Sequence, residues 1–348
     1  MSSFIALNKA AIATYKDRLL GRKAEPTWDV DLEIGVRFWR RQFALAMEAG
    51  DIRTGRAILD SLQTETPDVY EVDASTQTRP RGTWYRPRHG KSDCVVLYFH
   101  GGGYAFYGAM SRRFGAMLAH HIGAPVFAPD YRLTPEHPHP AQAEDAMAAW
   151  RGVTADRSPK RIVVIGDSAG GHMMLCLLLN LKEAGLPQPA LAIGLCPWTD
   201  IGDRGASLRD NDRYDLVQGW MALRFGQWLD PEGRFGRAAL SPIAHDFSGC
   251  APLYLQSGGR EVLRDMICEF AQKQARAGAD VLLDVWPAMP HDFQLFDSTQ
   301  AASIEALQRI AASVRHAMSE DESFGPGERT EVSSESGWAF SPGWEFAG

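Results

Sequence analysis

A serine flanked by glycines is the first candidate for chemistry in this sequence. Residues 166–171 read Gly-Asp-Ser-Ala-Gly-Gly, between a run rich in Val and Ile and an apolar helical pattern. A G-x-S-x-G match in this strand-to-helix context is typical of a nucleophile elbow, a sharp turn that exposes the serine hydroxyl. Glycines suit such a turn because a Cβ would collide with neighbouring backbone. We therefore predict that Ser168 is the nucleophile of an acyl-transfer reaction.

A second glycine-rich segment could stabilise the negative charge that such a reaction develops. His100 is followed by Gly101, Gly102 and Gly103, directly after another apolar run. Tandem glycines at this place can turn backbone N–H groups toward a developing oxyanion. Neither glycine-rich segment has the G-x-G-x-x-G spacing or the Gly-Lys-Ser/Thr ending of a phosphate-binding loop, so nucleotide binding is the weaker interpretation.

The general base should come last in chain order, close to the end of a strand. His291 lies in the segment Met-Pro-His-Asp-Phe at 289–293, just after an apolar run that ends at residue 285. Among the other nine histidines, His120, His121, His137 and His139 precede Ser168, His172 lies on the helix that follows it, and His316 is near the tail. The order of the motifs therefore favours His291 as the base.

An acid that orients the histidine should lie between Ser168 and His291, after the next-to-last strand. Two carboxylates compete in the segment 258–265: Glu261, and Asp265 one helical turn later. Glu261 comes first after the strand, whereas Asp265 could simply face solvent. We predict Glu261 and keep Asp265 as the alternative.

The elements that must position these residues alternate along the chain from residue 93 onward. Short apolar runs typical of buried strands occur at 94–99, 125–128, 161–165, 190–195, 253–256 and 281–285. Helical patterns lie between them at 111–121, 140–150, 169–184 and 263–277. This alternation predicts an α/β fold with a mostly parallel central sheet flanked by helices. Residues 70–74 and 83–86 look like antiparallel edge strands that lead into it.

Two further segments could cover the sheet and form a helical cap. Residues 1–65 have helical periodicity with Trp28, Phe38, Trp39 and Phe43, and lack strand alternation. Residues 200–237 form an insertion after a strand and carry Trp220, Phe225 and Trp228. We therefore predict a catalytic domain at 66–318 that contains this second cap segment. Residues 319–348 are polar, Gly-rich and aperiodic, which predicts a flexible tail.

The composition is that of an ordinary globular protein with a net charge of −7 over 348 residues. It offers no basic stripe for nucleic acid. The five cysteines lack metal-type or redox-type spacing, so we expect them to be reduced core residues. The N-terminus has no signal-peptide core, which predicts a cytoplasmic protein. The longest apolar stretch, 173–179, is much shorter than the roughly 20 residues of a membrane span, so no integral membrane association is expected.

Together these segments resemble the bacterial hormone-sensitive lipase family of esterases, from about residue 95 to 296. The stretch 130–140, Asp-Tyr-Arg-Leu-Thr-Pro-Glu-His-Pro-His-Pro, is similar to that family's middle segment. The resemblance implies an α/β-hydrolase fold with a helical cap and a triad of Ser168, His291 and an acid. It also implies an oxyanion hole that includes the N–H groups of Gly102, Gly103 and Ala169, where Gly101 assists the turn. Many relatives have Asp-Pro-Leu where this chain has Glu-Val-Leu at 261–263, although the subgroup with Gly-Asp-Ser-Ala-Gly often uses Glu.

The resulting hypothesis is a serine carboxylesterase for short-to-medium acyl esters that requires no metal and no organic cofactor. The same triad could instead act on an N-acetyl amide, a carbamate or a lactone. A ligand-binding protein on this scaffold, such as the plant gibberellin receptors, is disfavoured because those receptors lack the base. A lipase acting at lipid interfaces is a further alternative, suggested by Arg37, Arg40 and Arg41 near the cap aromatics. A homodimer is also possible.

Overall fold

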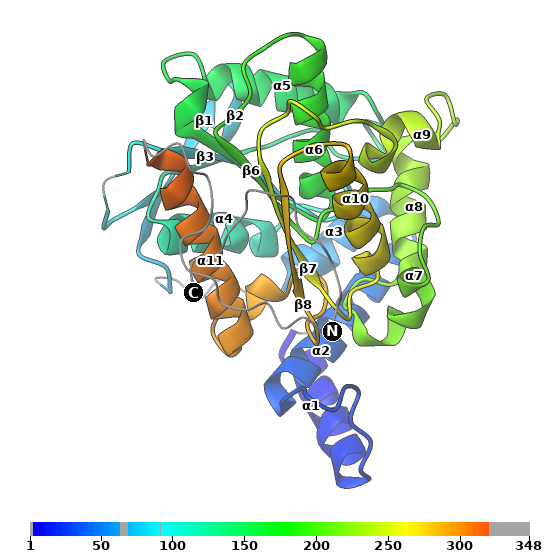
Figure 1. Cartoon of the computed structure of the whole chain (residues 1–348). Coiled ribbons are helices and arrows are strands. Elements are labelled where there is room, and N and C mark those ends of the chain that lie inside the picture. Colours follow the sequence, from blue (N-terminus) through cyan, green and yellow to red (C-terminus); the bar gives the residue numbers. More distant parts are fainter. Residues whose placement is uncertain (1–2, 63–68, 91, 320–348) are drawn as a thin grey trace.

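A single eight-stranded sheet forms the centre of the computed structural model, which describes residues 3–62, 69–90 and 92–319 (Figure 1). The strand order is β1-β2-β4-β3-β5-β6-β7-β8. β2 pairs antiparallel with β1 and β4, whereas every pair formed among β3 to β8 is parallel. The predicted α/β class with a mostly parallel sheet is therefore confirmed.

Burial explains why the strand positions could be predicted. The eight strands are β1 (Val72–Thr78), β2 (Arg81–Pro87), β3 (Val95–Phe99), β4 (Val126–Pro129), β5 (Ile162–Asp167), β6 (Leu191–Leu195), β7 (Leu253–Gly258) and β8 (Val281–Trp286). The six predicted apolar strands all form, with ends shifted by at most two residues. The edge strand β1 runs four residues further than predicted, because backbone pairing with β2 continues through exposed polar positions that no apolar run marks.

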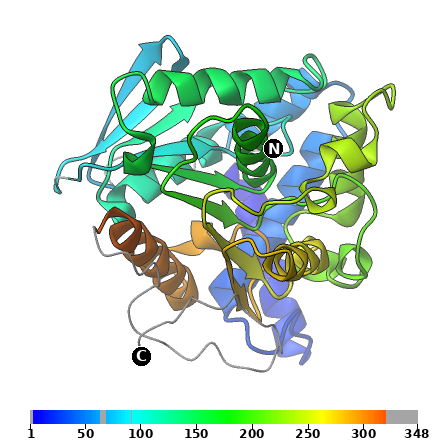
Figure 2. The same cartoon turned by 45° about the horizontal axis from the view of Figure 1, so that its top comes forward.

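Helices cover both faces of the sheet. α4 (Ala109–Ile122) and α11 (Ala301–Met318) pack on one face, while α5 (Ala141–Val153), α6 (Ala169–Glu183) and α10 (Arg264–Arg276) pack on the other. In Figure 2, α11 in dark orange lies below the sheet and α5 in green lies above it. The four predicted helices form within three residues of their expected ends. The alanine-rich α11 was not predicted.

Helices from two distant parts of the chain gather on one side of the molecule. They are α1 (Ser3–Leu19), α2 (Val30–Met47) and α3 (Ile52–Asp60) from the N-terminal part, and α7 (Ser207–Asp210), the 3-10 turn η2 (Asp212–Tyr214) and α8 (Gly219–Leu229) from the insertion. Arg40 of α2 joins the two parts by an ion pair with Asp212 and a 3.0 Å hydrogen bond to the Asp215 carbonyl. The cap boundaries, 1–65 and 200–237, stay predictions. The predicted tail lies, apart from Ser319, outside the described residues.

The chain between α1 and α2 is fastened to loops of the sheet. Trp28 donates its indole N–H to the Ala288 carbonyl at 2.5 Å, and Glu25 forms a 2.8 Å ion pair with Arg260. The N-terminal part of the chain thus reaches the loops that precede α10 and His291.

Short elements complete the described chain: η1 (Pro159–Arg161), α9 (Arg237–Leu240), η3 (Pro242–Ala244) and η4 (Phe293–Phe296).

The cysteines and the helix lengths bear on two further expectations. All five cysteines are free, and three of them are buried while Cys176 and Cys250 are half-buried. Among the helices formed by residues 3–62, 69–90 and 92–319, none combines the length and the apolar character needed to cross a membrane. The cytoplasmic location stays a prediction.

Candidate active site

Ser168 occupies a strained turn between β5 and α6. Its φ of 52° and ψ of −117° lie where a residue with a Cβ costs about 1–3 kcal/mol, so the surroundings must impose this conformation. The Ser168 N–H donates to the Leu195 carbonyl at 2.9 Å, and the Ser168 carbonyl accepts from Trp198 N–H at 3.0 Å. A side chain at Gly170 would overlap the Phe99 carbonyl. Neighbouring strands therefore hold the turn in the geometry of a nucleophile elbow.

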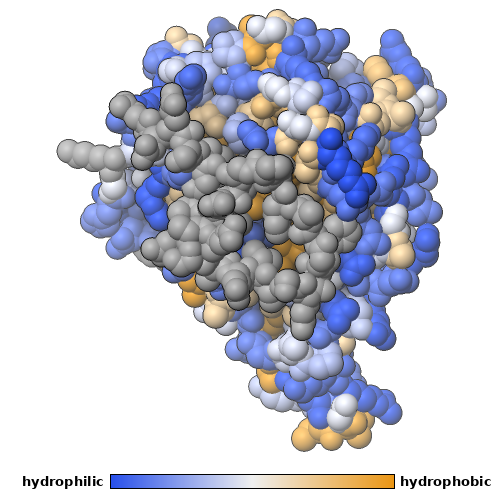
Figure 3. Space-filling view, in the orientation of Figure 1, coloured by the Kyte–Doolittle hydropathy of each residue, from blue (hydrophilic) through white to orange (hydrophobic). Residues whose placement is uncertain are grey.

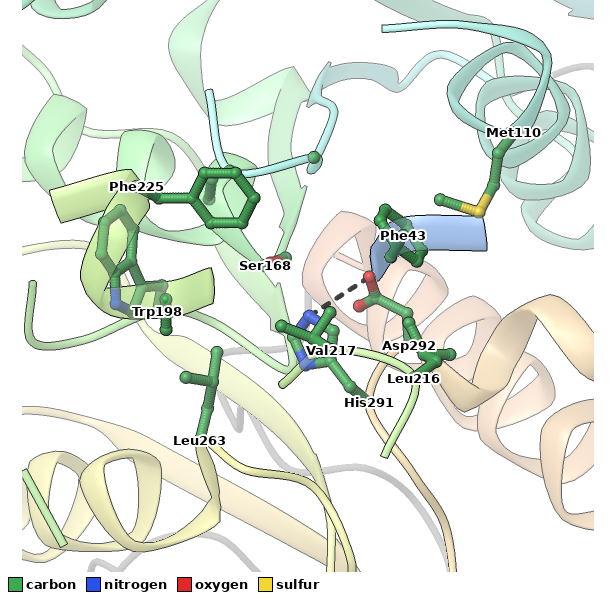
Figure 4. Close-up of a pocket in the computed structure, with 14 residues that line it drawn as sticks. Phe43, Met110, Ser168, Trp198, Leu216, Val217, Phe225, Leu263, His291 and Asp292 are labelled. Atoms are coloured by element: carbon green, nitrogen blue, oxygen red, sulfur yellow. Dashed lines mark ion pairs between the residues drawn. The ribbon is translucent and has the colours of Figure 1, made fainter. Parts of the chain in front are cut away.

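His291 lines the pocket that also contains Ser168 (Figure 4), and Glu261 contacts the imidazole of His291. Glu261 Oε2 lies 2.7 Å from His291 Nδ1, and both side chains are buried. The other Glu261 oxygen accepts hydrogen bonds from Ser257 Oγ at 2.7 Å and Gly258 N–H at 2.8 Å. This contact places a proton on Nδ1 and leaves Nε2 available as the basic atom.

The alternative acid, Asp265, has different partners. Its carboxylate accepts from Ser207 N–H at 2.9 Å and forms a 2.6 Å ion pair with Arg264. The structure thus brings Glu261, and not Asp265, to His291. His172 also stays away from the reaction centre. Its ring lies between the Tyr104 hydroxyl at 2.6 Å and the Leu240 carbonyl at 2.7 Å, and burial lowers its pKa to about 4.

The glycine loop after β3 presents two N–H groups to the same pocket. Gly102 and Gly103 have φ values of 94° and 62°, which a residue with a side chain rarely adopts. Gly102, Gly103 and Ala169 all line the pocket, and no hydrogen bond within the described part of the chain uses their N–H groups. Such unpaired donors beside a nucleophile can bind an oxyanion.

Gly101 differs from the two glycines that follow it, because its N–H is already occupied. It is the residue of the predicted oxyanion hole that assists the turn, and its N–H donates to Asp167 Oδ1 at 2.9 Å. The same oxygen accepts a 2.6 Å hydrogen bond from the Tyr98 hydroxyl. A Cβ at Gly101 would overlap the Asp167 carboxylate. Gly101 therefore shapes the turn, and its hydrogen bond connects the glycine loop to Asp167, the residue that precedes the nucleophile.

Asp215 is a buried residue of the insertion that sequence reasoning missed. Its carboxylate accepts from His291 N–H at 3.0 Å, Val262 N–H at 2.6 Å and Leu216 N–H at 2.7 Å. It thereby ties together the loops that carry the acid and the base. Burial raises the pKa of Asp215 to about 7. Nothing in the sequence marks this residue, because it follows a short turn in a segment without strand or helix periodicity.

Asp292 places a second carboxylate beside the imidazole of His291. Its Oδ2 lies 3.4 Å from His291 Nε2, as the dashed line in Figure 4 shows. Its Oδ1 is buried without a hydrogen-bond partner among the described residues. Burial alone would lower the pKa of His291, but the charges of Asp292 and Glu261 outweigh this effect and raise it above its ordinary value. Burial also raises the pKa of Asp292.

Apolar side chains from the sheet loops and from both cap segments form the walls of this pocket. Phe43 comes from α2, Phe225 from α8, and Trp198 from the loop after β6. The remaining apolar side chains of the wall are those of Met110, Leu216, Val217, Ala222 and Leu263. The two predicted cap segments contain several aromatic residues. Of those named above, Phe43 and Phe225 line this pocket, and the others do not. This enclosure suits an apolar acyl or alcohol group.

One group of side chains in the described ranges has donor atoms close enough to share a metal ion: Cys196, His291 and Asp292. Burial raises the pKa of the Cys196 thiol, which keeps it in the form that binds metals poorly. His291 already uses Nδ1 for Glu261, and its Nε2 faces the pocket. These three side chains therefore suit proton transfer at Nε2 better than metal binding. That the protein needs no metal and no cofactor stays a prediction.

Comparisons with known proteins agree with this geometry. A model of the α/β-hydrolase fold family matches residues 96–295, which is more than half of the chain. The chain belongs to this family. An acetyl-hydrolase from Streptomyces hygroscopicus is 34% identical over 246 residues, which cover 68% of this chain and 80% of that protein. An esterase from Acinetobacter venetianus is 29% identical over 294 residues, covering 78% of this chain and 95% of that protein.

A solved structure adds the subfamily. The crystal structure of an esterase from the bacterial hormone-sensitive lipase family has a TM-score of 0.78 and 28% sequence identity, and the match covers 84% of this chain and 100% of that chain. The expected relation of this α/β-hydrolase to the bacterial hormone-sensitive lipase family is confirmed.

Proposed function

We propose that Ser168, His291 and Glu261 form the catalytic triad of this enzyme and that its substrates are esters with short-to-medium acyl groups. The chain is a carboxylic ester hydrolase, as its family and its esterase relatives establish. One observation carries the assignment of the triad. Glu261 contacts His291 at 2.7 Å, and His291 lines the pocket that contains Ser168 at its strained turn.

The proposed reaction begins when His291 Nε2 removes the Ser168 proton and the serine oxygen attacks the ester carbonyl. The N–H groups of Gly102, Gly103 and Ala169 stabilise the negative oxygen of the tetrahedral intermediate. His291 then donates its proton to the leaving alcohol, and an acyl-enzyme remains. Water, activated by the same Nε2, hydrolyses the acyl-enzyme. Glu261 stabilises the imidazolium that forms in both steps.

The size of the acyl group is proposed from the shape of the pocket. Phe43 and Phe225 approach Ser168 from the two cap segments and leave little room for a long chain (Figure 4). A relative named acetyl-hydrolase supports a short acyl group. The relatives named esterase and carboxylesterase support ester substrates over amides, carbamates and lactones. A homodimer and a cytoplasmic location stay predictions.

A series of p-nitrophenyl esters from acetate to palmitate tests this proposal. The intact protein should hydrolyse the short esters fastest, and Ser168→Ala should lower kcat by about 10⁴-fold or more. Circular dichroism of Ser168→Ala checks that the variant folds. Equal hydrolysis by Ser168→Ala would reject the assignment of the nucleophile. Fastest hydrolysis of palmitate would instead reject the proposed chain length.

A further inference from the structure

α1 carries an apolar surface that the esterase reaction does not explain. The described chain has eleven exposed large hydrophobic side chains, and seven of them lie between residues 4 and 20. They are Phe4, Ile5, Leu7, Ile12, Tyr15, Leu19 and Leu20. The exposed fraction reaches 68% for Ile12 and 88% for Leu19. Single exposed hydrophobic residues are normal on proteins, but a cluster of this kind on one helix indicates an interaction surface.

The apolar packing of the body of the protein is against the opposite, small-residue face of α1. Ala6 and Ala10 pack against Phe38 of α2 and against Leu62. With 3.6 residues per turn, Phe4, Ile12, Tyr15 and Leu19 fall within an arc of about 80° on the other side of the helix. The exposed polar Asn8 lies in the same arc. Figure 1 shows α1 projecting from the body, and Figure 3 shows a hydrophobic patch at its outer end. The apolar stripe, defined as these four residues, therefore faces outward.

Positive charge accompanies the apolar stripe. Residues 3–23 contain five basic side chains and one acidic side chain, Asp17, in a protein whose net charge is −7. The basic residues are Lys9, Lys16, Arg18, Arg22 and Lys23. Asp17 and Arg18 each form a 2.8 Å ion pair with α2, Asp17 with Arg37 and Arg18 with Glu33. The other positive charges of the segment are those of Lys9, Lys16, Arg22 and Lys23. Lys16 is exposed and follows Tyr15 at the edge of the stripe. Positive charge is thus concentrated where the apolar side chains are exposed.

We propose that α1 docks this protein on an anionic lipid surface. A helix with an apolar face and flanking lysines lies in the plane of a membrane interface, with the apolar side chains among the acyl chains and the lysines near the phosphates. A second copy of this chain is the less suitable occupant. Pairing two stripes would bring the basic side chains of both copies together without an acidic complement.

Docking through α1 would also bring the substrate pocket toward the lipid surface, because α2 connects the two. α1 packs on α2, and α2 supplies Phe43 to the wall of the pocket. Docking through α1 therefore holds the cap side of the enzyme close to the lipid surface. This consequence rests on the proposed function, because it assumes that the pocket binds ester substrates. The docking itself does not depend on catalysis.

Flotation of the full-length protein with lipid vesicles tests the docking without measuring activity. One set of vesicles contains equimolar phosphatidylcholine and phosphatidylglycerol, and the other contains phosphatidylcholine alone. We expect the protein to float with the anionic vesicles, less with the neutral ones, and less as sodium chloride is added, because salt screens the charges. The double variant Ile12→Glu/Leu19→Glu should reduce binding by at least about tenfold. Lys16→Glu should reduce it by about tenfold.

Matched controls separate the stripe from general effects of charge. The single variant Ile304→Glu makes one such apolar-to-Glu change on α11, at a side chain that is 40% exposed, and should not alter flotation. Lys160→Glu changes the net charge as Lys16→Glu does, at an exposed residue of η1, and should alter flotation little. Thermal unfolding of each variant verifies the fold.

Three results would overturn the proposal. They are absence of vesicle binding by the unmodified protein, equal binding to both kinds of vesicle, and equal losses in the α1 variants and their controls. Sedimentation of the unmodified protein tests whether a second copy of the chain, and not a lipid surface, covers the stripe. A dimer that Ile12→Glu/Leu19→Glu dissociates, without vesicle binding, would assign the stripe to a second copy of the chain. Esterase activity has no part in these outcomes, so failure of the proposed function would be recognised separately.

Discussion

The sheet loops and the cap contribute to the same pocket in different ways. The loops at the carboxyl ends of β5, β7 and β8 supply Ser168, Glu261 and His291, each held by hydrogen bonds to backbone or buried side chains. The cap supplies apolar side chains such as Phe43 and Phe225, which meet the pocket through packing. Polar geometry of this kind tolerates little displacement, whereas apolar walls can be repacked. The difference indicates that the sheet determines the chemistry and the cap determines the substrate.

The largest effect should come from the acid on the sheet side. Glu261→Gln keeps the shape of the side chain but removes the charge that stabilises the imidazolium, so we expect kcat to fall by about 10⁴-fold. The matched variant Asp265→Asn should retain kcat within a few-fold, because Asp265 contacts Ser207 and Arg264 instead of His291. Steady-state kinetics with p-nitrophenyl acetate measure both. A comparable loss in Asp265→Asn would contradict the role given to Glu261.

Substitution of Asp215 tests whether the catalytic loops of the sheet depend on the cap. Asp215→Ala leaves the N–H groups of His291, Val262 and Leu216 without an acceptor, which should lower the free energy of unfolding by about 3 kcal/mol. We also expect kcat to fall by about 10²-fold, because the loops of the base and the acid lose their common anchor. Denaturant unfolding and kinetics measure the two effects.

Asp215→Asn serves as the partial replacement. It keeps one acceptor oxygen and should recover part of both losses. A variant Asp215→Ala with unchanged stability and unchanged kcat would show that the cap and the catalytic loops are independent.

Asp292 should affect the pH dependence of the reaction. His291 must be neutral to accept the serine proton, so kcat/KM falls when the pH drops below the His291 pKa. The nearby carboxylates raise this pKa, so the acidic limb of the profile should lie above pH 6.5, the ordinary value for histidine. Asp292→Asn removes a negative charge 3.4 Å from Nε2 and should move the limb down by about one pH unit.

The control for this experiment is again Asp265→Asn, which removes a carboxylate charge away from the imidazole. Its pH profile should match that of the unmodified protein. Asparagine also tolerates the left-handed backbone of residue 292, whose φ is 49°, so the fold should be retained. An unchanged limb in Asp292→Asn would mean that this carboxylate does not influence the base.

The smallest effect should come from the apolar wall of the cap. Phe43→Ala enlarges the pocket, so kcat/KM for p-nitrophenyl octanoate should rise relative to acetate by about threefold to tenfold. Trp220→Ala is the matched control in the other cap segment, since Trp220 is exposed and does not line the pocket. A fall in kcat for both esters would indicate instead that Phe43 supports the catalytic loops and not the acyl group.

The comparison also explains what the sequence could predict. Ser168, His291 and the strands around them follow from local patterns, because buried parallel strands are short apolar runs and the nucleophile turn requires glycines. Asp215 acts through hydrogen bonds to residues 47 and 76 positions away, which no periodicity records. Asp292 stands beside His291 in the sequence, but its approach to Nε2 depends on a left-handed backbone conformation.

The role of Gly101 shows a second limit. Three consecutive glycines offer three N–H groups, and their types alone do not say which of them face the pocket. The answer depends on Asp167, whose side chain at the end of β5 accepts a hydrogen bond from the N–H of Gly101.

The cap arginines show the same limit of sequence-based prediction. Arg37 and Arg40 suggested a lipid-binding face, yet both form ion pairs within the cap, and the exposed apolar stripe lies on α1.

The way in which the chain between α1 and α2 is fastened has a consequence for proteolysis. From Glu25 onward the chain is bound to the sheet loops, whereas Arg22 and Lys23 just before it are exposed. Trypsin cleaves after such residues. A single cut there would separate α1 from the polypeptide that carries the catalytic residues and would leave the contacts of Glu25 and Trp28 in place. After one such cut, α1 would stay attached to the hydrolase only through its noncovalent contacts, among them the Asp17–Arg37 and Arg18–Glu33 ion pairs with α2.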